Sequence, residues 1–414
     1  MTSVPPRRLQ RSLRGGLRVA VEERRFAPSV AIRISLAFGA VDDPADLPGA
    51  AQLAWSWQER GAVGLDARAR AERFASLGAR VSGQVGRERA LLAVRLPAAG
   101  WRAALALLGD EIVRPDLDDA PFEIARRHAL DARAARDARP AEVAHDALLA
   151  RTFASPHGRA VVGRAGALTV ATPDRVRRHR TATLGASGAV VALVGPVDVQ
   201  EAADAVQAAL GAWSAGSRTA SSRPERRFAP PARHEDRLDA EQAQLGWAWP
   251  SLPPDHPLAD AQALAITILG DGPGSRLFDE VREARGLVYQ VDAALHEAPD
   301  AAWTTVTAQA TPRQAERVVR TVEAELARAR DGVSEDELAW ARLRHRAGTA
   351  ETAETTSGRA WQLARDLLLL GRVRSLEERL DAWSVPTRAT VAEAVAAAPP
   401  ERATSYLGRP RGPG

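Results

Sequence analysis

The chain has 414 residues, 45% hydrophobic and 26% charged, a composition typical of a globular protein with about two to three domains. It contains no cysteine and no lysine, which excludes disulfides, thiolate metal sites and lysine Schiff-base chemistry. The net charge of +4 is small, and arginine is interspersed with acidic residues rather than clustered with aromatics, so nucleic acid is not an expected partner. No apolar run is long enough to predict a membrane-spanning helix, so a membrane is not expected either.

The N-terminal stretch MTSVPPRRLQRSLRGG is basic but lacks an apolar core, so it does not read as a secretory signal. We interpret it as a short basic arm before the first strand. A transit peptide is the alternative, because the stretch is rich in arginine and free of acidic residues. The expected location is cytoplasmic.

The first half of the chain predicts a buried helix in LPGAAQLAWSWQERGA (47–62), where apolar residues recur at helical spacing. A strand, a proline, a helix, an acidic turn and a second helix follow. Near the end of this half come a buried strand and another helix. The predicted ranges are strand 89–96, helix 101–113, helix from 122, strand 189–195 and helix 199–213.

The stretch from Ser214 to Asp236 is rich in serine, proline and arginine and has no apolar period, so it is predicted to be an extended linker. Beyond it the same order recurs: strand 303–310, Pro312, helix 315–329, an acidic turn, a helix from 338, and a late strand at 403–408. Pro97 and Pro312 are 215 residues apart (312 − 97), and Phe122 and Leu338 are 216 apart (338 − 122). This near-constant offset indicates duplication.

The predicted fold class is therefore α+β, with two homologous domains, each a mostly antiparallel sheet with helices packed on one face. The predicted boundaries are 1–213 for the first domain, 214–236 for the linker and 237–414 for the second domain.

Several stretches resemble the pitrilysin/insulinase-type metallopeptidases. In the first half these are GLRVAVEE, SVAIRISLAFGAVDDP, GAAQLAWSW and FASPHGRAVVG; in the second half GSRLFDEVREARGLVYQV is the strongest match. The resemblance covers almost the whole chain and implies a two-domain subunit of the kind that acts in pairs, as in the mitochondrial processing peptidase and bacterial heterodimers.

The chemistry of this family depends on an inverted zinc motif, H-x-x-E-H, with a further Glu about 75 residues downstream. Two His four residues apart share a helical face and can bind one zinc, while the Glu acts as general base. Aligned on this motif, the sequence carries Gln52, Trp55 and Ser56, and the downstream Glu falls on Ala132. The resemblance thus implies a degenerate site with no metal. None of the eight His residues pairs with another at this spacing to replace it.

The second half keeps a different part of the family's site. The resemblance assigns Arg282 and Tyr289, seven residues apart, to the pair that contacts the bound peptide near the scissile carbonyl. An arginine donor and a phenol can both hydrogen-bond a carbonyl oxygen that gains negative charge. We expect Arg282 on a helix and Tyr289 on the strand that follows Gly286. The residue-based alternative is a surface arginine and a core tyrosine.

These observations favour a non-catalytic subunit of a heterodimeric zinc metallopeptidase that acts on peptides. The expected partner is a homologous subunit that carries the zinc, and this chain needs no cofactor of its own. The alternative is a structural or peptide-binding protein of the same fold without a proteolytic role. The peptide substrate and the identity of the partner are not specified by the sequence.

Overall fold

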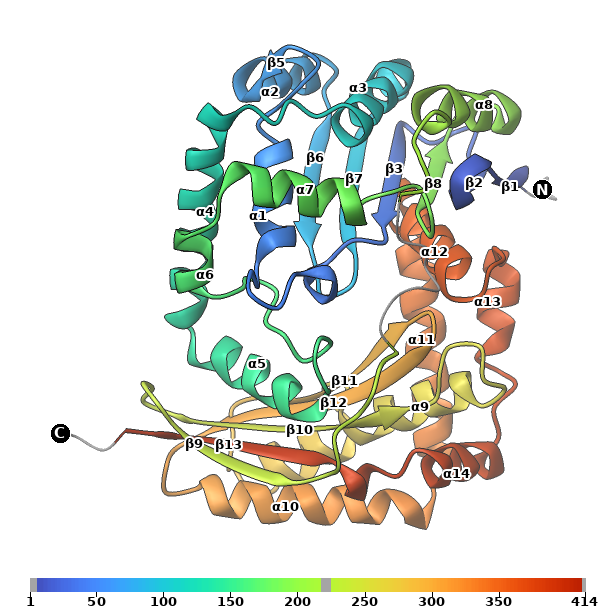
Figure 1. Cartoon of the computed structure of the whole chain (residues 1–414). Helices are drawn as coiled ribbons and strands as arrows, with labels where there is room; N and C mark the ends of the chain where they lie inside the picture. Colours follow the sequence, from blue (N-terminus) through green and yellow to red (C-terminus); the bar gives the residue numbers. More distant parts are fainter. Residues whose placement is uncertain (1–5, 217–224, 412–414) are drawn as a thin grey trace. The chain divides into compact units, whose positions relative to one another are not determined.

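The computed structural model describes residues 6–216 and 225–411, so residues 217–224 of the predicted linker lie outside the described residues. The chain forms two compact units. The first contains residues 1–135, 159–225 and 352–374, and the second contains residues 136–158, 226–351 and 375–414. Figure 1 shows the elements of both units.

The first unit is built on a six-stranded sheet in the order β1-β2-β8-β3-β7-β6, in which β2 and β8 are parallel and the other pairs antiparallel. A small hairpin, β4–β5, stands apart from it. The strands are β1 (Arg8–Ser12), β2 (Arg18–Glu23), β3 (Ser29–Leu36), β4 (Gly61–Ala62), β5 (Leu65–Asp66), β6 (Arg80–Val85), β7 (Ala90–Pro97) and β8 (Val190–Gly195). The helices are α1 (Ala50–Gln58), α2 (Ala67–Ser76), α3 (Trp101–Val113), α4 (Asp119–Asp137), α6 (Ala165–Thr169), α7 (Pro173–Thr183), α8 (Val199–Leu210) and α12 (Thr356–Leu369).

The second unit has a five-stranded sheet in the order β11-β12-β10-β13-β9, again with one parallel pair, β13 and β9. Its strands are β9 (Arg233–Leu238), β10 (Ala243–Ser251), β11 (Val291–Ala298), β12 (Ala301–Ala310) and β13 (Thr404–Pro410). Its helices are α5 (Pro140–Thr152), α9 (Ala259–Gly270), α10 (Ala315–Arg328), α11 (Glu335–Glu354), α13 (Leu376–Ala382) and α14 (Arg388–Ala397). The predicted α+β class with two mostly antiparallel sheets is confirmed.

The compact units differ from the predicted boundaries because the two halves exchange one helix each. Helix α5 comes from the first half but packs on β10 and β13, and α12 comes from the second half but packs on β2, β3 and β8 (Figure 1). The two helices begin 216 residues apart (356 − 140), which matches the repeat predicted from the sequence. The predicted domains 1–213 and 237–414 therefore need this correction, and no local pattern in either helix reveals which sheet it will cover.

Strand β8 explains why the exchange is needed. Its residues are buried on both faces of the sheet, so it reads as a continuous apolar run. Val191 and Leu193 belong to the main core under α1, α3 and α8, while Val190, Ala192 and Val194 face α12. Helix α12 meets them with Ala360, Leu363, Ala364 and Leu367, which recur at helical spacing.

A buried ion cluster fixes α12 to the sheet. Arg359 is fully buried and donates to both carboxylate oxygens of Glu22 on β2, at 2.7 to 3.0 Å. Arg8 and Arg24 also donate to Glu22, at 2.8 and 3.2 Å. Burial alone raises the pKa of Glu22, but the hydrogen bonds and charges of Arg359 and Arg8 outweigh it and hold the pKa below its usual range.

The described part of the predicted linker is not simply extended. Phe228 forms an antiparallel bridge with Phe153 just after α5, and the two rings lie 4.8 Å apart. Arg226 pairs with Asp300 at 2.9 Å. Strand β9 begins at Arg233, inside the predicted range 214–236. The end of the linker is thus part of the second unit.

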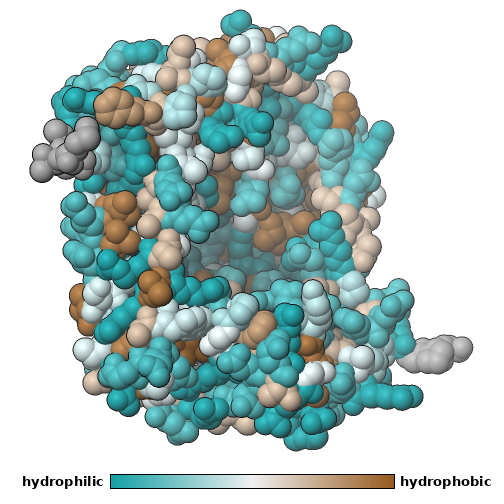
Figure 2. All heavy atoms as spheres, turned by 180° about the vertical axis from the view of Figure 1, so that it is seen from behind, coloured by the Kyte–Doolittle hydropathy of each residue, from teal (hydrophilic) through white to brown (hydrophobic). Residues whose placement is uncertain are grey.

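The surface seen in Figure 2 has hydrophobic side chains interspersed among hydrophilic ones. The exposed large hydrophobic residues are distributed along the sequence, from Phe26 to Val385. Within residues 6–216 and 225–411, no helix is both long and apolar enough to span a membrane.

Truncating Arg359 should be strongly destabilising, because it leaves the Glu22 carboxylate buried without its main partner. We expect Arg359→Ala to lower the free energy of unfolding by about 3–5 kcal/mol in urea denaturation at pH 7. The matched control is Arg68→Ala, which removes an exposed ion pair with Glu72 and should cost less than about 1 kcal/mol. Equal losses for the two variants would show that the buried cluster does not hold α12 in place.

Candidate functional site

Helix α1 carries three of the four positions that align with the family's zinc ligands and general base. A buried carboxylate fixes the start of this helix. Asp43 accepts hydrogen bonds from the backbone N–H groups of Gly49 and Ala51, at 2.6 and 2.7 Å. Gly49 has φ of 101°, a conformation that favours glycine, and precedes the first helical residue. Burial raises the pKa of Asp43 to about 7, although these two hydrogen bonds and the charge of Arg159 act in the opposite direction.

The face of α1 that would carry a metal holds Gln52, Trp55 and Ser56. Trp55 is buried, and its indole N–H donates to Glu59, one turn further on, at 3.0 Å. Both side chains lie against Gly83 of the edge strand β6, where a Cβ would be 2.6 Å from the Glu59 carboxylate and 3.1 Å from the Trp55 ring. Burial raises the pKa of Glu59, against the charge of Arg70 and the Trp55 hydrogen bond.

Trp57 points to a different part of the unit. Its N–H donates to the carbonyl of Asp118 at 2.9 Å, and its ring meets Phe122 edge-on at 4.9 Å. Both partners lie at the start of α4 or just before it. Since residues 52, 55, 56 and 59 share one helical face and 57 does not, only Trp55 occupies the aligned metal face. Ala132 lies further along α4 and is half-buried.

These residues do not fit a catalytic zinc ion, which needs three protein ligands among His, Asp, Glu and Cys. The aligned positions offer an amide, an indole, a hydroxyl and a methyl group. Throughout the described residues, no group of three or more His, Cys, Asp or Glu is arranged to hold a metal. What the site provides is packing, centred on the indole of Trp55.

In the second unit, Arg282 and Tyr289 lie together. Arg282 is on a π-helical turn (Phe278–Glu283), and its guanidinium carbon is 5.0 Å from the centre of the Tyr289 ring. The expectation that Tyr289 lies on a strand is wrong: it is in a bend two residues before β11. The alternative of a core tyrosine is also wrong, because Tyr289 is 83% exposed. Gly286, with φ of 56°, reverses the chain between them.

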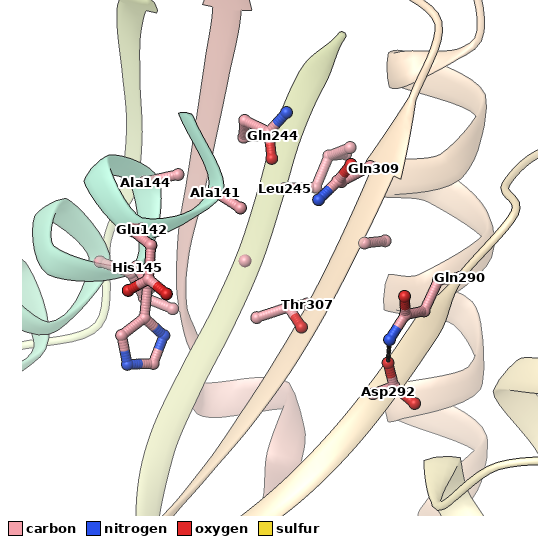
Figure 3. A pocket seen from close by; sticks show the side chains of 13 residues that line it. Ala141, Glu142, Ala144, His145, Gln244, Leu245, Gln290, Asp292, Thr307 and Gln309 are labelled. Atoms are coloured by element: carbon pink, nitrogen blue, oxygen red, sulfur yellow. Dashed lines mark hydrogen bonds between the residues drawn. The ribbon is translucent and has the colours of Figure 1, made fainter. Parts of the chain in front are cut away.

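A cavity of about 350 Å³ with both apolar and polar lining residues lies in the same unit, and Gln290, the neighbour of Tyr289, is part of its lining (Figure 3). Helix α5 contributes Glu142 and His145, and the exposed edge of the sheet contributes Asp292. The other polar lining side chains are Gln244, Thr307 and Gln309. Amide and hydroxyl groups of this kind can both donate and accept hydrogen bonds, as peptide groups require.

Several of these residues were not predicted from the sequence. The cavity combines α5 with strands from the other half, so it depends on the helix exchange and has no local signal. Phe278, by contrast, could have been found from its spacing in the sequence. It lies four residues before Arg282 on a helical segment, and its ring is 4.7 Å from the Arg282 guanidinium. Gly272 and Gly274, which follow α9, have positive φ, and Gly270 at the end of α9 closely approaches Ala293.

The donor set predicts that the purified chain holds much less than one zinc per chain. Elemental analysis after dialysis against zinc-free buffer measures this directly. The matched comparison is the variant Gln52→His, Trp55→Glu, Ser56→His, Ala132→Glu, which restores three ligands and a base. One tightly held zinc in the unchanged chain would show that other residues form a metal site.

The pKa of Asp43 predicts a pH dependence of stability. An unfolded Asp titrates near 3.9, so between about pH 4 and 7 the folded state keeps a proton that the unfolded state releases. The stabilisation of the folded state by protonated Asp43 is fully present below pH 4 and is lost as the pH rises towards 7. Asp43→Asn should make the fall in unfolding free energy over this window less steep, by up to about 1.4 kcal/mol per pH unit.

Denaturation series at pH 4 to 7 test the Asp43 linkage. Asp46→Asn, a change at an exposed carboxylate three residues away, is the control and should follow the unchanged chain. If Asp43→Asn and the control show the same slope, Asp43 is ionised in the folded state throughout the window.

Comparison with known proteins agrees with this geometry. Residues 18–164 match the family described as insulinase (peptidase family M16), and residues 171–344 match the peptidase M16 inactive domain. A protein from Mycobacterium tuberculosis named an uncharacterized zinc protease is 30% identical over 394 residues, covering 91% of this chain and 87% of the relative. A Bacillus subtilis protein of the same description is 23% identical and covers 88% of each chain.

Two solved structures share the fold. The M16 inactive domain from Pseudomonas fluorescens superimposes with a TM-score of 0.88 at 23% identity, over 98% of both chains. A protease from Helicobacter pylori superimposes with a TM-score of 0.87 at 15% identity, over 98% of this chain and all of the other. Sequence matches in both halves and a 30% identical relative of nearly full length place the chain in peptidase family M16, the insulinase family.

Proposed function

We propose that this chain is the non-catalytic subunit of a heterodimeric zinc metallopeptidase. A homologous subunit with an intact H-x-x-E-H motif supplies the zinc, and this chain completes the peptide chamber. Arg282 and Tyr289 supply hydrogen-bond donors to the carbonyl of the bound peptide. The relatives named zinc proteases support the reaction class, and the loss of ligands on α1 supports the division of roles.

The observation that carries the proposal is the exposure of the Arg282 side chain and its few polar partners. It is about one-third exposed, and its one ion pair is with Glu283, at 3.4 Å. The pair uses Nε, and within the described residues no hydrogen bond engages the two terminal nitrogens of the guanidinium. The phenol of Tyr289 is on the same side of the turn and is exposed. A guanidinium and a phenol placed together, with terminal N–H groups and a hydroxyl as donors, suit an oxygen that becomes negatively charged in peptide hydrolysis.

A scaffold without any proteolytic role is the second candidate, because the chain has no metal ligands of its own. A scaffold makes no use of the exposed Arg282–Tyr289 pair, so the two candidates differ in what happens when these donors are removed. Association with the zinc-bearing subunit is expected in both cases, so the deciding measurement is kcat.

In a complex with a zinc-bearing family member from the same organism, Arg282→Ala and Tyr289→Phe should each lower kcat for peptide cleavage by about 100- to 1,000-fold. Each change removes a donor that acts mainly on the transition state, so KM should change little. Tyr289→Phe removes only the hydroxyl and is the cleaner variant. Size-exclusion chromatography should show that both complexes still assemble.

The matched control is Arg285→Ala. Arg285 lies three residues from Arg282, is exposed, and pairs with Glu280 at 3.1 Å. Its loss should leave kcat within about twofold, because surface ion pairs contribute little. Unchanged kcat for all three variants would support the scaffold instead.

A further inference from the structure

The guanidinium of Arg282 lies over two aromatic rings. Its guanidinium carbon is 4.7 Å from the centre of the Phe278 ring and 5.0 Å from the centre of the Tyr289 ring. Both separations are within the range of cation–π contacts, and arginine stacks on aromatic rings more readily than lysine does. The Tyr289 ring is far more exposed than that of Phe278, which is half-buried.

The backbone brings the three side chains together through an unusual turn. The N–H of Ala284 bonds to the carbonyl of Asp279, five residues back, at 2.8 Å, which defines a π-helical turn. Such turns occur mostly as single insertions and frequently at functional sites. Buried Val281 anchors the turn, and its carbonyl accepts from the N–H of Leu287 at 3.0 Å. Gly286 then reverses the chain towards Tyr289.

An aromatic ring that lies over the face of a guanidinium leaves the edge of the group available for hydrogen bonds. The five N–H groups of arginine lie in the plane of the group, so a ring that covers one face does not compete with an acceptor at the edge. A long, partly exposed side chain without such contacts samples many rotamers, and ordering it at the moment of binding costs free energy. Two stacked rings reduce that cost before the substrate arrives.

We propose that Phe278 is a positioning residue for Arg282. It holds the guanidinium against the Tyr289 ring, so that the N–H edge of Arg282 and the Tyr289 hydroxyl are directed at the same peptide carbonyl. Phe278 acts through Arg282 and makes no bond to the peptide. The inference rests on the proposed function, since the carbonyl belongs to a substrate cut by the partner's zinc.

The stack itself is testable in the isolated full-length chain. An Nε–Hε group held near two rings has an upfield ring-current shift in the NMR spectrum, and Arg282→Lys identifies the resonance by its disappearance. Phe278→Leu keeps an apolar side chain and removes the ring, so the resonance should move downfield, whereas Phe278→Trp should keep it upfield. A resonance at the position of a free arginine in the unchanged chain would overturn the inference.

Catalysis provides the second test, in the complex with the zinc-bearing subunit. Phe278→Leu should lower kcat by about two- to fivefold, the range expected from one cation–π contact at a partly exposed site. KM should not change. Phe278→Trp should restore most of kcat. In the Arg282→Ala background, Phe278→Leu should have no further effect, because Phe278 acts only through Arg282.

The outcomes separate this inference from the proposed function. If Arg282→Ala lowers kcat but Phe278→Leu does not, or if Phe278→Leu lowers it equally with and without Arg282, the positioning role is wrong and the proposed function stands. If Arg282→Ala leaves kcat unchanged, the proposed function is wrong and the positioning role falls with it. Thermal unfolding of each variant identifies any loss that comes from misfolding.

Discussion

The buried pair formed by Arg359 and Glu22 is the interaction on which the first unit depends. It joins a helix from the end of the chain to a strand near its beginning, across 337 residues of sequence. Burying two charges is costly, and the structure compensates with three hydrogen bonds between them and further bonds from Arg8 and Arg24. The pair and the apolar contacts of α12 together keep the second face of strand β8 buried.

In the second unit too, a helix from the other half of the chain packs on the sheet, but other residues hold it. Helix α5 packs Leu148 over Gly246, where any larger residue would collide with it. Arg151 pairs with Asp236 at 2.7 Å and lies over the ring of Tyr406. Each sheet therefore needs a helix from the other half of the chain. Neither half, cut at the linker, contains all the residues of a compact unit.

The face of α1 that aligns with the family's zinc motif is packed in the structure but offers no metal ligands. The backbone N–H groups at the start of the helix bond to Asp43, and all its residues except the half-buried Gln52 and Ser56 are buried. The indole of Trp55 and the carboxylate of Glu59 lie against Gly83, on the strand that forms the edge of the sheet. In contrast, Tyr289 is exposed, and the half-buried Arg282 lies beside it with an ion pair to Glu283. This asymmetry is what the division of labour in a heterodimer would produce.

The sequence predicted the elements well where periodicity was strong. Helix 101–113 and strand 189–195 agree with α3 and β8 within one residue. The predicted offset of 215 to 216 residues also separates the starts of α5 and α12. Three features were not predicted because they depend on contacts between residues far apart in the sequence: the helix exchange, the cavity beside α5, and the contact of Phe228 with Phe153. Tyr289 was expected on the strand after Gly286, but β11 begins only at Val291, and the intervening Leu287 and Val288 are buried.

Reconstitution tests the central claim most directly. The purified chain, a purified zinc-bearing family member and an equimolar mixture are compared for zinc content, mass in solution and cleavage of an unstructured peptide. The mixture should form a one-to-one complex with one zinc, and only the mixture should cleave the peptide efficiently. Cleavage by this chain alone, or a zinc-bearing subunit that is equally active without it, would contradict the account.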